Sequence, residues 1–503
     1  MKTKIVIVAL TFFSFFSCSK NENELKIINS ILEDESSYFY TNLDPYKKKD
    51  AKLPIGIFDS GTGGLTVFDA IVNFDKYRNT DRKYLQNGDS IKDFNEECFI
   101  YLADQANMPY GNYGAHKKSG LLKEHVLKDA QFLLDSKYYE SGTNEVFKND
   151  KSPIKAMVIA CNTATAYAKE EIEELIQKAG LNLKVIGVIG AGVRSALSQI
   201  KSNENVSVAI MATAGTVSSN GYVNEINKQL AERNNSGEIF IYQQAGIGIA
   251  GAIDEAIEYI DQTETKPRNL YKGPSDVNKD LQINLKILNR YNFDWSDNNI
   301  LYNGTIENPV KIQLNSVKNY INYHVTSLLE QMVKSEKKSK LKSIVLGCTH
   351  YPFYTDFFNK QIEFLRNYSE EGNFVYSDFL SDKIDFIDPA LFTAKELYDY
   401  LAKEELFNNN DISNSEFYIS VPNYSNKNTF IDESGNFEYD YKYGRKVNEI
   451  QQYVKRVPFS KKTISKNVLE RLSQKIPFTY SLIQEFNSTN PKTKYLNRDF
   501  RIE

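Results

Sequence analysis

Two cysteines of this chain occupy similar settings in the sequence. Each ends an apolar run, and each is followed by side chains that can donate hydrogen bonds to a carboxylate: Asn162 and Thr163 after Cys161, and Thr349 and His350 after Cys348. A cysteine at a turn from strand to helix lies near backbone N–H groups and the positive end of the helix, which lower the pKa of its thiol. We therefore expect both cysteines to favour the thiolate.

Such a pair suggests acid–base chemistry at a carbon atom. If the two turns face each other across a cleft, one thiolate can remove a proton from a carbon while the other thiol returns a proton to the opposite face. That reaction inverts a stereocentre without a cofactor, provided that the site places donors where charge develops and excludes water. Asp59 and His350 are the candidates to assist proton movement. Alternatively, each cysteine is a small buried apolar residue.

The elements that must position these residues follow a regular order between residues 54 and 400. Short apolar runs, each followed by small or polar residues, occupy 55–58, 98–102, 156–160, 185–189, 206–211, 238–242 and 343–346. Helical patterns follow several of them. Apolar strands that alternate with helices are typical of parallel sheets covered on both faces, so the predicted fold class is α/β. Ligands of such sheets bind beyond the carboxyl ends of the strands, where these polar clusters lie.

Several stretches depart from this alternation. We interpret three polar stretches as insertions: residues 78–96, 136–152 and 262–340. The alternation fades beyond residue 405, and we treat 406–503 as a C-terminal extension of unknown role. Its patterns predict one strand at 417–421 and two helices at 447–454 and 464–474.

The N-terminus has the order of a targeting signal. Two lysines precede the mostly apolar residues 5–16, a run that is too short to span a bilayer comfortably. The run ends in Ser17-Cys18 and is followed by polar residues, which resembles a bacterial lipoprotein signal. That resemblance implies a signal peptide over 1–18, cleavage before Cys18, and lipid on its thiol. Residues 19–53 are then a polar tether with one short helix at 25–32.

This signal predicts an exported protein, lipid-anchored to a bacterial membrane on its periplasmic or cell-surface side. The alternative is an uncleaved anchor or a buried N-terminal strand. The formal net charge of −4 gives no electrostatic reason to expect a nucleic-acid partner. The 4 cysteines are too few for a disulfide scaffold, and the 4 histidines have no zinc-ligand spacing, so we expect no metal.

Two glycine-rich stretches offer competing interpretations. Gly246-x-Gly248-x-x-Gly251 formally matches the dinucleotide fingerprint and follows a predicted strand. It lies far inside the chain rather than in an opening βαβ unit, so NAD binding is only a weak alternative. Gly190-Ala191-Gly192 is interpreted as a tight turn.

Six motifs, in order, resemble those of glutamate racemases in the aspartate/glutamate racemase superfamily. They are Ile57–Val67, Asp104 through Pro109-Tyr110-Gly111, Ala160–Ala164, Thr213 and Thr216 followed by Ser219 and Tyr222, Gly347–Pro352, and Ile387–Ala390. The resemblance covers roughly residues 54–400. Several ordered motifs are far more specific than one short pattern.

The resemblance implies two pseudo-symmetric, doubly wound α/β lobes with the site in the cleft between them. The first lobe would be 54–190, completed by 385–405, and the second 191–384 with the insertion at 262–340. The catalytic residues would be Cys161, Cys348, Asp59 and His350, acting without a cofactor. The substrate's charged groups would be held by Ser60, Tyr110, Gly111, Asn162, Thr163, Thr213, Thr216 and Thr349. The implied substrate is glutamate or aspartate.

Two departures from the family keep other functions open. The stretch 242–251 lacks the Cys-Pro segment of the family, and its following glutamate has no clear counterpart. The alternatives are therefore a decarboxylase or lyase acting on a related dicarboxylate, or a surface protein that binds amino acids without turnover. An exported enzyme would act on free or released amino acids rather than supply cell-wall synthesis directly. The insertion could cover the cleft or form an interface, as in a homodimer.

Overall fold

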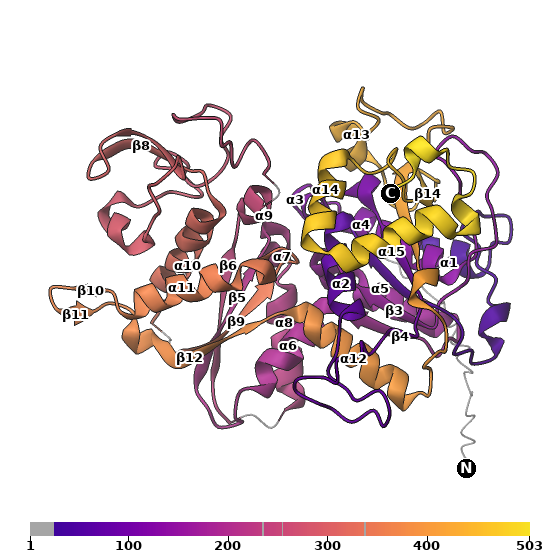
Figure 1. Cartoon of the computed structure of the whole chain (residues 1–503), viewed down its shortest axis with the longest axis horizontal. Coiled ribbons are helices and arrows are strands. Elements are labelled where there is room, and N and C mark those ends of the chain that lie inside the picture. Colours follow the sequence, from indigo (N-terminus) through magenta and orange to yellow (C-terminus); the bar gives the residue numbers. More distant parts are fainter. Residues whose placement is uncertain (1–24, 234–235, 254, 337–338) are drawn as a thin grey trace, which may run out of the picture.

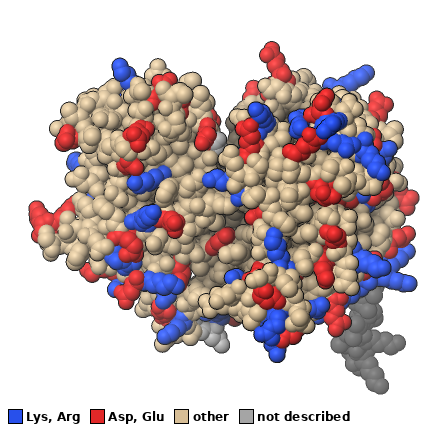
Figure 2. Space-filling view, in the orientation of Figure 1, with Lys and Arg blue, Asp and Glu red and all other residues tan. Residues whose placement is uncertain are grey.

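The computed structural model describes residues 25–233, 236–253, 255–336 and 339–503. The signal peptide predicted over 1–18, with Cys18, lies outside these residues. Two lobes lie side by side, each built around a sheet whose strands are mainly parallel (Figure 1). A notch separates the two lobes at the top of the space-filling view (Figure 2). Basic and acidic side chains are interspersed over the whole face shown there.

The first lobe contains a sheet with the strand order β14-β13-β2-β1-β3-β4. Four of its strands come from the N-terminal half of the chain and run parallel to one another: β1 (Ile55–Asp59), β2 (Phe99–Ala103), β3 (Ala156–Ile159) and β4 (Lys184–Gly187). The helices that pack around it include α2 (Leu65–Val72), α3 (Gly111–Ala115), α4 (Ser119–Leu134), α5 (Asn162–Lys178) and α12 (Pro389–Lys403). Burial on both faces explains why these strands are continuous apolar runs.

The second lobe contains a sheet with the order β12-β9-β5-β6, in which all neighbours are parallel. Its strands are β5 (Val206–Ala212), β6 (Ile239–Ala245), β9 (Leu341–Gly347) and β12 (Leu380–Ile387). Its helices are α6 (Val188–Ser198), α7 (Ala214–Ser218), α8 (Gly221–Glu232), α9 (Ile249–Ile253), α10 (Val317–Lys334) and α11 (Thr355–Arg366). The short hairpin of β10 (Ser369–Glu370) and β11 (Asn373–Phe374) follows α11.

The strand order relates the two lobes to each other. Numbered along the chain within each lobe, both sheets contain the order second, first, third, fourth. Cys161 follows the third strand of the first lobe, and Cys348 follows the third strand of the second lobe. The predicted α/β fold class with two related lobes is therefore confirmed.

The connections between the lobes are helical. Gly190–Gly192, for which a tight turn was expected, lies within α6 and is buried there, so that prediction is wrong. The chain returns to the first lobe after β12, where the buried side chains of α12 join the core of that lobe.

The stretch 262–340 contains both inserted and core structure. An antiparallel ribbon of β7 (Ile300–Gly304) and β8 (Pro309–Leu314) stands outside the parallel sheet. The stretch also contains α10, which packs against β6 and supplies many buried side chains to the lobe's core. The inserted part therefore ends before α10.

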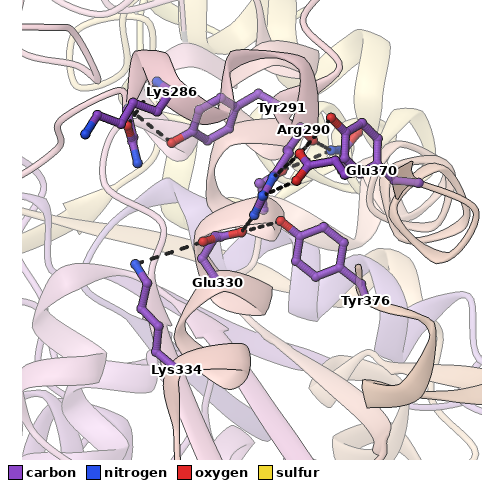
Figure 3. A network of polar contacts seen from close by, with 11 residues as sticks. Lys286, Arg290, Tyr291, Glu330, Lys334, Glu370 and Tyr376 are labelled. Carbon is purple, nitrogen blue, oxygen red and sulfur yellow. Dashed lines mark hydrogen bonds and ion pairs between the residues drawn. The ribbon is translucent and has the colours of Figure 1, made fainter. Parts of the chain in front are cut away.

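An ion-pair network ties the insertion to the helices of the second lobe (Figure 3). Arg290 binds Glu330 of α10 at 2.8 Å and Glu370 of the β10–β11 hairpin at 2.7 Å. Tyr376 donates its hydroxyl hydrogen to Glu330 as well. Because one partly buried arginine joins three separate segments, this network stabilises the insertion in one position.

Both ends of the described chain add to the first lobe. The N-terminal helix α1 (Lys26–Leu32) buries Ile27 and Ile31 completely, so residues 25–53 pack on the lobe rather than forming a free tether. In the C-terminal extension, β13 (Glu416–Pro422) pairs in parallel with β2, and β14 (Val454–Pro458) pairs antiparallel with β13.

The remaining helices of the extension are α13 (Tyr439–Gly444), α14 (Lys466–Lys475) and α15 (Pro477–Thr489). The helix expected over 447–454 is wrong, because that stretch is irregular and ends at the start of β14. The strand and the second helix expected in the extension are confirmed as β13 and α14. Within the described residues, the chain has no helix of the length and apolar character that a bilayer crossing requires.

Candidate active site

The polar residues singled out in the sequence lie where parallel strands end. Asp59 is the last residue of β1, and Cys161 is the N-cap of α5, directly beyond β3 and Ala160. In the second lobe, Thr213 is the N-cap of α7, and Cys348 follows β9. Strand ends of one parallel sheet share an edge, so each lobe presents its own cluster there.

Cys161 and Asp59 form the first half of the site. The Cys161 thiol donates a hydrogen bond to the Asp59 carboxylate, and its sulfur accepts one from the backbone N–H of Ala164 at 3.4 Å. The same carboxylate accepts backbone N–H bonds from Gly61 at 3.2 Å and Gly64 at 2.8 Å. These bonds fix the carboxylate beside the sulfur.

This environment disfavours the Cys161 thiolate. Burial, and next the negative charge of Asp59, raise the pKa of Cys161 to about 12, although donors on Ala164 and Ser60 oppose the shift. The expectation that the strand-to-helix turn lowers this pKa is therefore wrong, because desolvation outweighs the nearby N–H groups. Burial also raises the pKa of Asp59, against the backbone N–H groups that it accepts from.

Cys348 and His350 form the second half of the site. The sulfur of Cys348 lies 3.7 Å from Nδ1 of His350, and the hydroxyl oxygen of Thr349 lies 3.4 Å from the same nitrogen. An imidazole nitrogen at this position can take a proton from the thiol and return it. Cys348 is buried, as Cys161 is.

The two halves converge on Gly63, in the turn after β1. A methyl group built on Gly63 would lie 3.5 Å from the His350 ring, 3.6 Å from Oγ1 of Thr349 and 3.7 Å from Oδ2 of Asp59. Groups from both lobes thus lie within ordinary van der Waals distance of one point. The structure therefore brings Asp59, with its partner Cys161, close to the His350 segment.

A cavity of about 110 Å³ lies beside Cys348, with Asn162 and Thr349 in its wall. Ordinary ligand pockets measure roughly 300–1,000 Å³, so this space suits only a small molecule. Asn162 accepts a hydrogen bond from the hydroxyl of Tyr222 in α8 at 2.9 Å, which links the lobes across the cleft. Asp388 also lines the cavity, and burial raises its pKa.

Sequence reasoning did not assign a role to Tyr222 or Asp388. Both lie within motifs that carry the resemblance, and that membership was the available signal. Tyr222 bonds to Asn162 of the other lobe, and Asp388 lines a cavity with residues of both lobes, so these contacts depend on the tertiary structure.

The other predicted binding residues occupy different surroundings. The hydroxyl oxygens of Thr213 and Thr216 lie 3.0 Å apart at the start of α7. Ser60 donates hydrogen bonds to Cys161, and Thr163 is buried in the first turn of α5. Tyr110 is buried, and its hydroxyl oxygen lies 2.6 Å from a carboxylate oxygen of Asp104 and 2.8 Å from one of Asp129, so this hydroxyl is already engaged.

Gly111 lies where the two lobes touch. A methyl group built on Gly111 would lie 3.3 Å from the Cα atom of Gly215 in α7. Backbone therefore meets backbone across the cleft, next to both Tyr110 and Thr213.

The glycines of the dinucleotide-like pattern make room for tyrosine rings. A methyl group on Gly246 would lie 2.2 Å from the Tyr351 hydroxyl oxygen, and one on Gly251 would lie 2.3 Å from the Tyr259 ring. The space that a pyrophosphate would need at these glycines is thus occupied by side chains. Packing explains this pattern better than NAD binding does.

Several curated glutamate racemases are similar in sequence to the chain. A glutamate racemase of Persephonella marina is 31% identical to the chain over 225 residues, which are 42% of this chain and 66% of that protein. A glutamate racemase of Aquifex pyrophilus is 33% identical over 35% of this chain and 51% of that protein. One of Thermoanaerobacter sp. is 24% identical over 75% of this chain and 90% of that protein. The chain is related to glutamate racemases.

The glutamate racemases that are at least 31% identical to the chain align over only part of their length. The chain spans about half to two thirds of the length of these relatives. No protein-family model matches the chain.

Solved structures of glutamate racemases are similar to the chain at low sequence identity. Glutamate racemase isoform RacE1 of Bacillus anthracis aligns with a TM-score of 0.41 at 20% identity, over 73% of this chain and 86% of that one. A glutamate racemase of Francisella tularensis in complex with D-glutamate aligns with a TM-score of 0.40 at 20% identity, over 80% and 100% of the two chains.

Proposed function

We propose that the chain is a cofactor-independent amino-acid racemase that inverts the α-carbon of glutamate or aspartate. The observation that carries this proposal is the convergence of Asp59, with its partner Cys161, and of His350, with its partner Cys348, on Gly63. The curated relatives, which are glutamate racemases, support the same reaction.

In the proposed reaction, the Cys348 thiolate takes the α-proton and becomes a thiol, while the Cys161 thiol gives its proton to the opposite face and becomes a thiolate. The raised pKa of Cys161, about 12, suits it to rest as the donor. His350 accepts the proton of Cys348 before the reaction starts. For the other enantiomer the two cysteines exchange roles, and Asp59 takes the proton of Cys161.

The substrate's carboxylate and amine would be bound by donors at the strand ends. Asn162 and Thr349 line the cavity beside Cys348, and Tyr222 orients the Asn162 amide by donating to its carbonyl oxygen. Thr213 and Thr216 supply two further hydroxyl groups. Displacement of water from the cavity by the bound substrate would strengthen these interactions.

The decisive experiment incubates the purified protein with each enantiomer of glutamate and of aspartate in D2O. Optical rotation and deuterium at the α-carbon are followed together. Racemisation accompanied by deuteration, and lost in Cys161→Ser and in Cys348→Ser, is the expected result. Activity that is unchanged after alkylation of both thiols would exclude the two-cysteine reaction.

Two alternatives give different results in the same experiment. Release of CO2 or cleavage of the substrate indicates a decarboxylase or lyase, and binding without deuteration indicates a surface protein that binds amino acids. The family's glutamate after the stretch 242–251 has no clear counterpart here, which keeps the binding protein as an alternative. The retention of both cysteines favours the racemase.

We also propose that the protein is exported and anchored by lipid on Cys18. The order of lysines, apolar run and Ser17-Cys18 supports this proposal. Growth with labelled palmitate should label the wild-type chain but not Cys18→Ser, and only the wild type should sediment with membranes. Label in both forms would contradict the anchor.

A further inference from the structure

The C-terminal extension contacts one wall of the proposed site through a series of polar side chains. We name residues 104–116 the cleft segment and residues 439–445, which are α13 and Arg445, the C-terminal brace. The two lie more than 320 positions apart in the sequence. Nothing in the sequence patterns predicted that they would meet.

The cleft segment touches the site on two sides. A methyl group built on Gly61, two residues after Asp59, would lie 2.8 Å from the sulfur of Met108 and 2.9 Å from the side chain of Gln105. On its other side, Gly111 meets Gly215 of the second lobe. A shift of the cleft segment would therefore move both the Asp59 turn and the contact between the lobes.

The brace binds the cleft segment at successive positions. Arg445 donates to Oδ1 of Asn107 at 2.8 Å and to the hydroxyl of Tyr113 at 3.2 Å. Lys442 donates to the backbone oxygen of Met108 at 2.8 Å. Two more pairs join the same elements: the Asn112 amide donating to the Tyr443 hydroxyl at 3.1 Å, and Nε2 of His116 bonded to the Tyr439 hydroxyl at 2.7 Å.

These contacts matter because they support a buried carboxylate, that of Asp104. The Asn107 amide donates to both carboxylate oxygens of Asp104, at 3.1 and 2.9 Å, and Asp104 also accepts from Tyr110. Arg445 therefore holds Asn107 in the orientation that satisfies Asp104. Asp104 is fully buried, so an unsatisfied carboxylate there would be costly.

From these contacts we infer that the C-terminal brace positions the cleft segment, with Arg445 and Lys442 as positioning residues for the proposed reaction. Holding the cleft segment in place before the substrate arrives lowers the entropic cost of binding. The kinetic part of this inference rests on the proposed function. The structural part, that the brace orders residues 104–116, does not.

The test compares Arg445→Met and Lys442→Met with Lys446→Ala in the full chain. Lys446 is exposed and follows Arg445 directly, so it is a matched control. Hydrogen exchange of peptides covering 104–116 should be at least about fivefold faster in both brace variants than in the control. KM for the amino acid should rise about five- to twentyfold while kcat changes less than about threefold, because uniform binding is lost.

These readouts separate positioning from a general loss of stability. Partial unfolding would lower the active fraction, and hence the apparent kcat, without raising the KM of the molecules that remain. Should Arg445→Met fail to fold, Lys442→Met still decides the matter, because Lys442 is only partly buried. Unchanged exchange and unchanged KM in Lys442→Met would overturn the inference. A wild-type protein without racemase activity would refute the proposed function, while the exchange measurement would still test the brace.

Discussion

The Cys161 side and the Cys348 side of the site occupy equivalent positions in two sheets of the same strand order, but different groups surround their sulfur atoms. The Cys161 thiol donates a hydrogen bond to the Asp59 carboxylate, and this carboxylate also accepts hydrogen bonds from the backbone N–H groups of Gly61 and Gly64. Cys348 lies beside an imidazole, that of His350. The order of strands is the same in the two lobes, whereas the proton acceptor beside each thiol differs.

Asp59 gives the Cys161 thiol a neighbour that favours its protonated state. A carboxylate beside a buried thiol adds a like charge to the thiolate and raises its pKa, which is the situation of Cys161. An imidazole can take up the proton of Cys348 and carry a positive charge beside the sulfur that remains. The two lobes thus share a strand order but place chemically different proton acceptors beside their cysteines.

The strongest test of this comparison is the removal of each sulfur. Cys161→Ser and Cys348→Ser should each lower kcat/KM for racemisation by about 10³-fold, since a positioned acid or base contributes on the order of 10²–10⁴. The measurement is optical rotation with both enantiomers. Cys98→Ser is the matched control, because Cys98 is also buried but lies directly before β2, and the variant should stay within about twofold of wild type. A variant at either site that retains wild-type activity would show that the two sides are not partners.

The next effect in size concerns how closely the lobes approach. In Gly215→Ala the new methyl group would lie 2.6 Å from the Cα atom of Gly111, so backbone must shift. Because a misplacement of about 1 Å can cost roughly 10²-fold, we expect kcat/KM to fall by about 10- to 100-fold. Gly120→Ala in α4 is the control, since its methyl group would meet only Val447 at 3.8 Å. Equal activity of the two variants would mean that the contact between Gly111 and Gly215 is not needed.

Much of the fold could be predicted because local sequence patterns mark its strands and their ends. The apolar runs that became β3 and β9 are buried on both faces, and the polar residues after them mark the carboxyl ends of strands. The pKa of Cys161 could not be predicted, because burial and the position of Asp59, about 100 residues earlier, decide it. The composition of 262–340 concealed α10, whose asparagine and tyrosine side chains are buried against the rest of the lobe.

The C-terminal extension shows why tertiary pairing defeats local patterns. Residues 447–454 have the spacing of a helix, but the stretch leads into β14, which bonds to β13. The paired residues lie 32 to 40 positions apart in the sequence, so pairing within the sheet overrides the local helical propensity. For the same reason, the contacts of Arg445 with the cleft segment had no signal in the sequence.

A smaller effect should appear in the reactivity of Cys161 with iodoacetamide. With a pKa of about 12, alkylation should rise about tenfold per pH unit from pH 7 to pH 10 without a plateau. Asp59→Asn removes the negative charge that raises this pKa, so the pKa falls and alkylation at pH 8 should be about tenfold faster. Mass spectrometry in the Cys348→Ser background reports on Cys161 alone.

The control for that measurement is Asp388→Asn, which removes a carboxylate that lines the cavity beside Cys348. It should leave the alkylation rate of Cys161 unchanged within about twofold. A plateau below pH 9 in the wild type, or the same acceleration in both aspartate variants, would contradict the assignment of Cys161 as the resting donor.

The smallest effect should come from the hydrogen bond that crosses between the lobes. Tyr222→Phe removes the donor to Asn162, so the amide is free to turn, and the loss of about 1 kcal/mol corresponds to a fall of about fivefold in kcat/KM. Tyr320→Phe is the matched control, because its buried hydroxyl bonds only within the second lobe, to Tyr259 and Tyr271. Both variants should lose similar stability in thermal unfolding, but only Tyr222→Phe should lose activity. If the two lose activity equally, stability explains the effect, and the unequal sides of the site are not coordinated through Asn162.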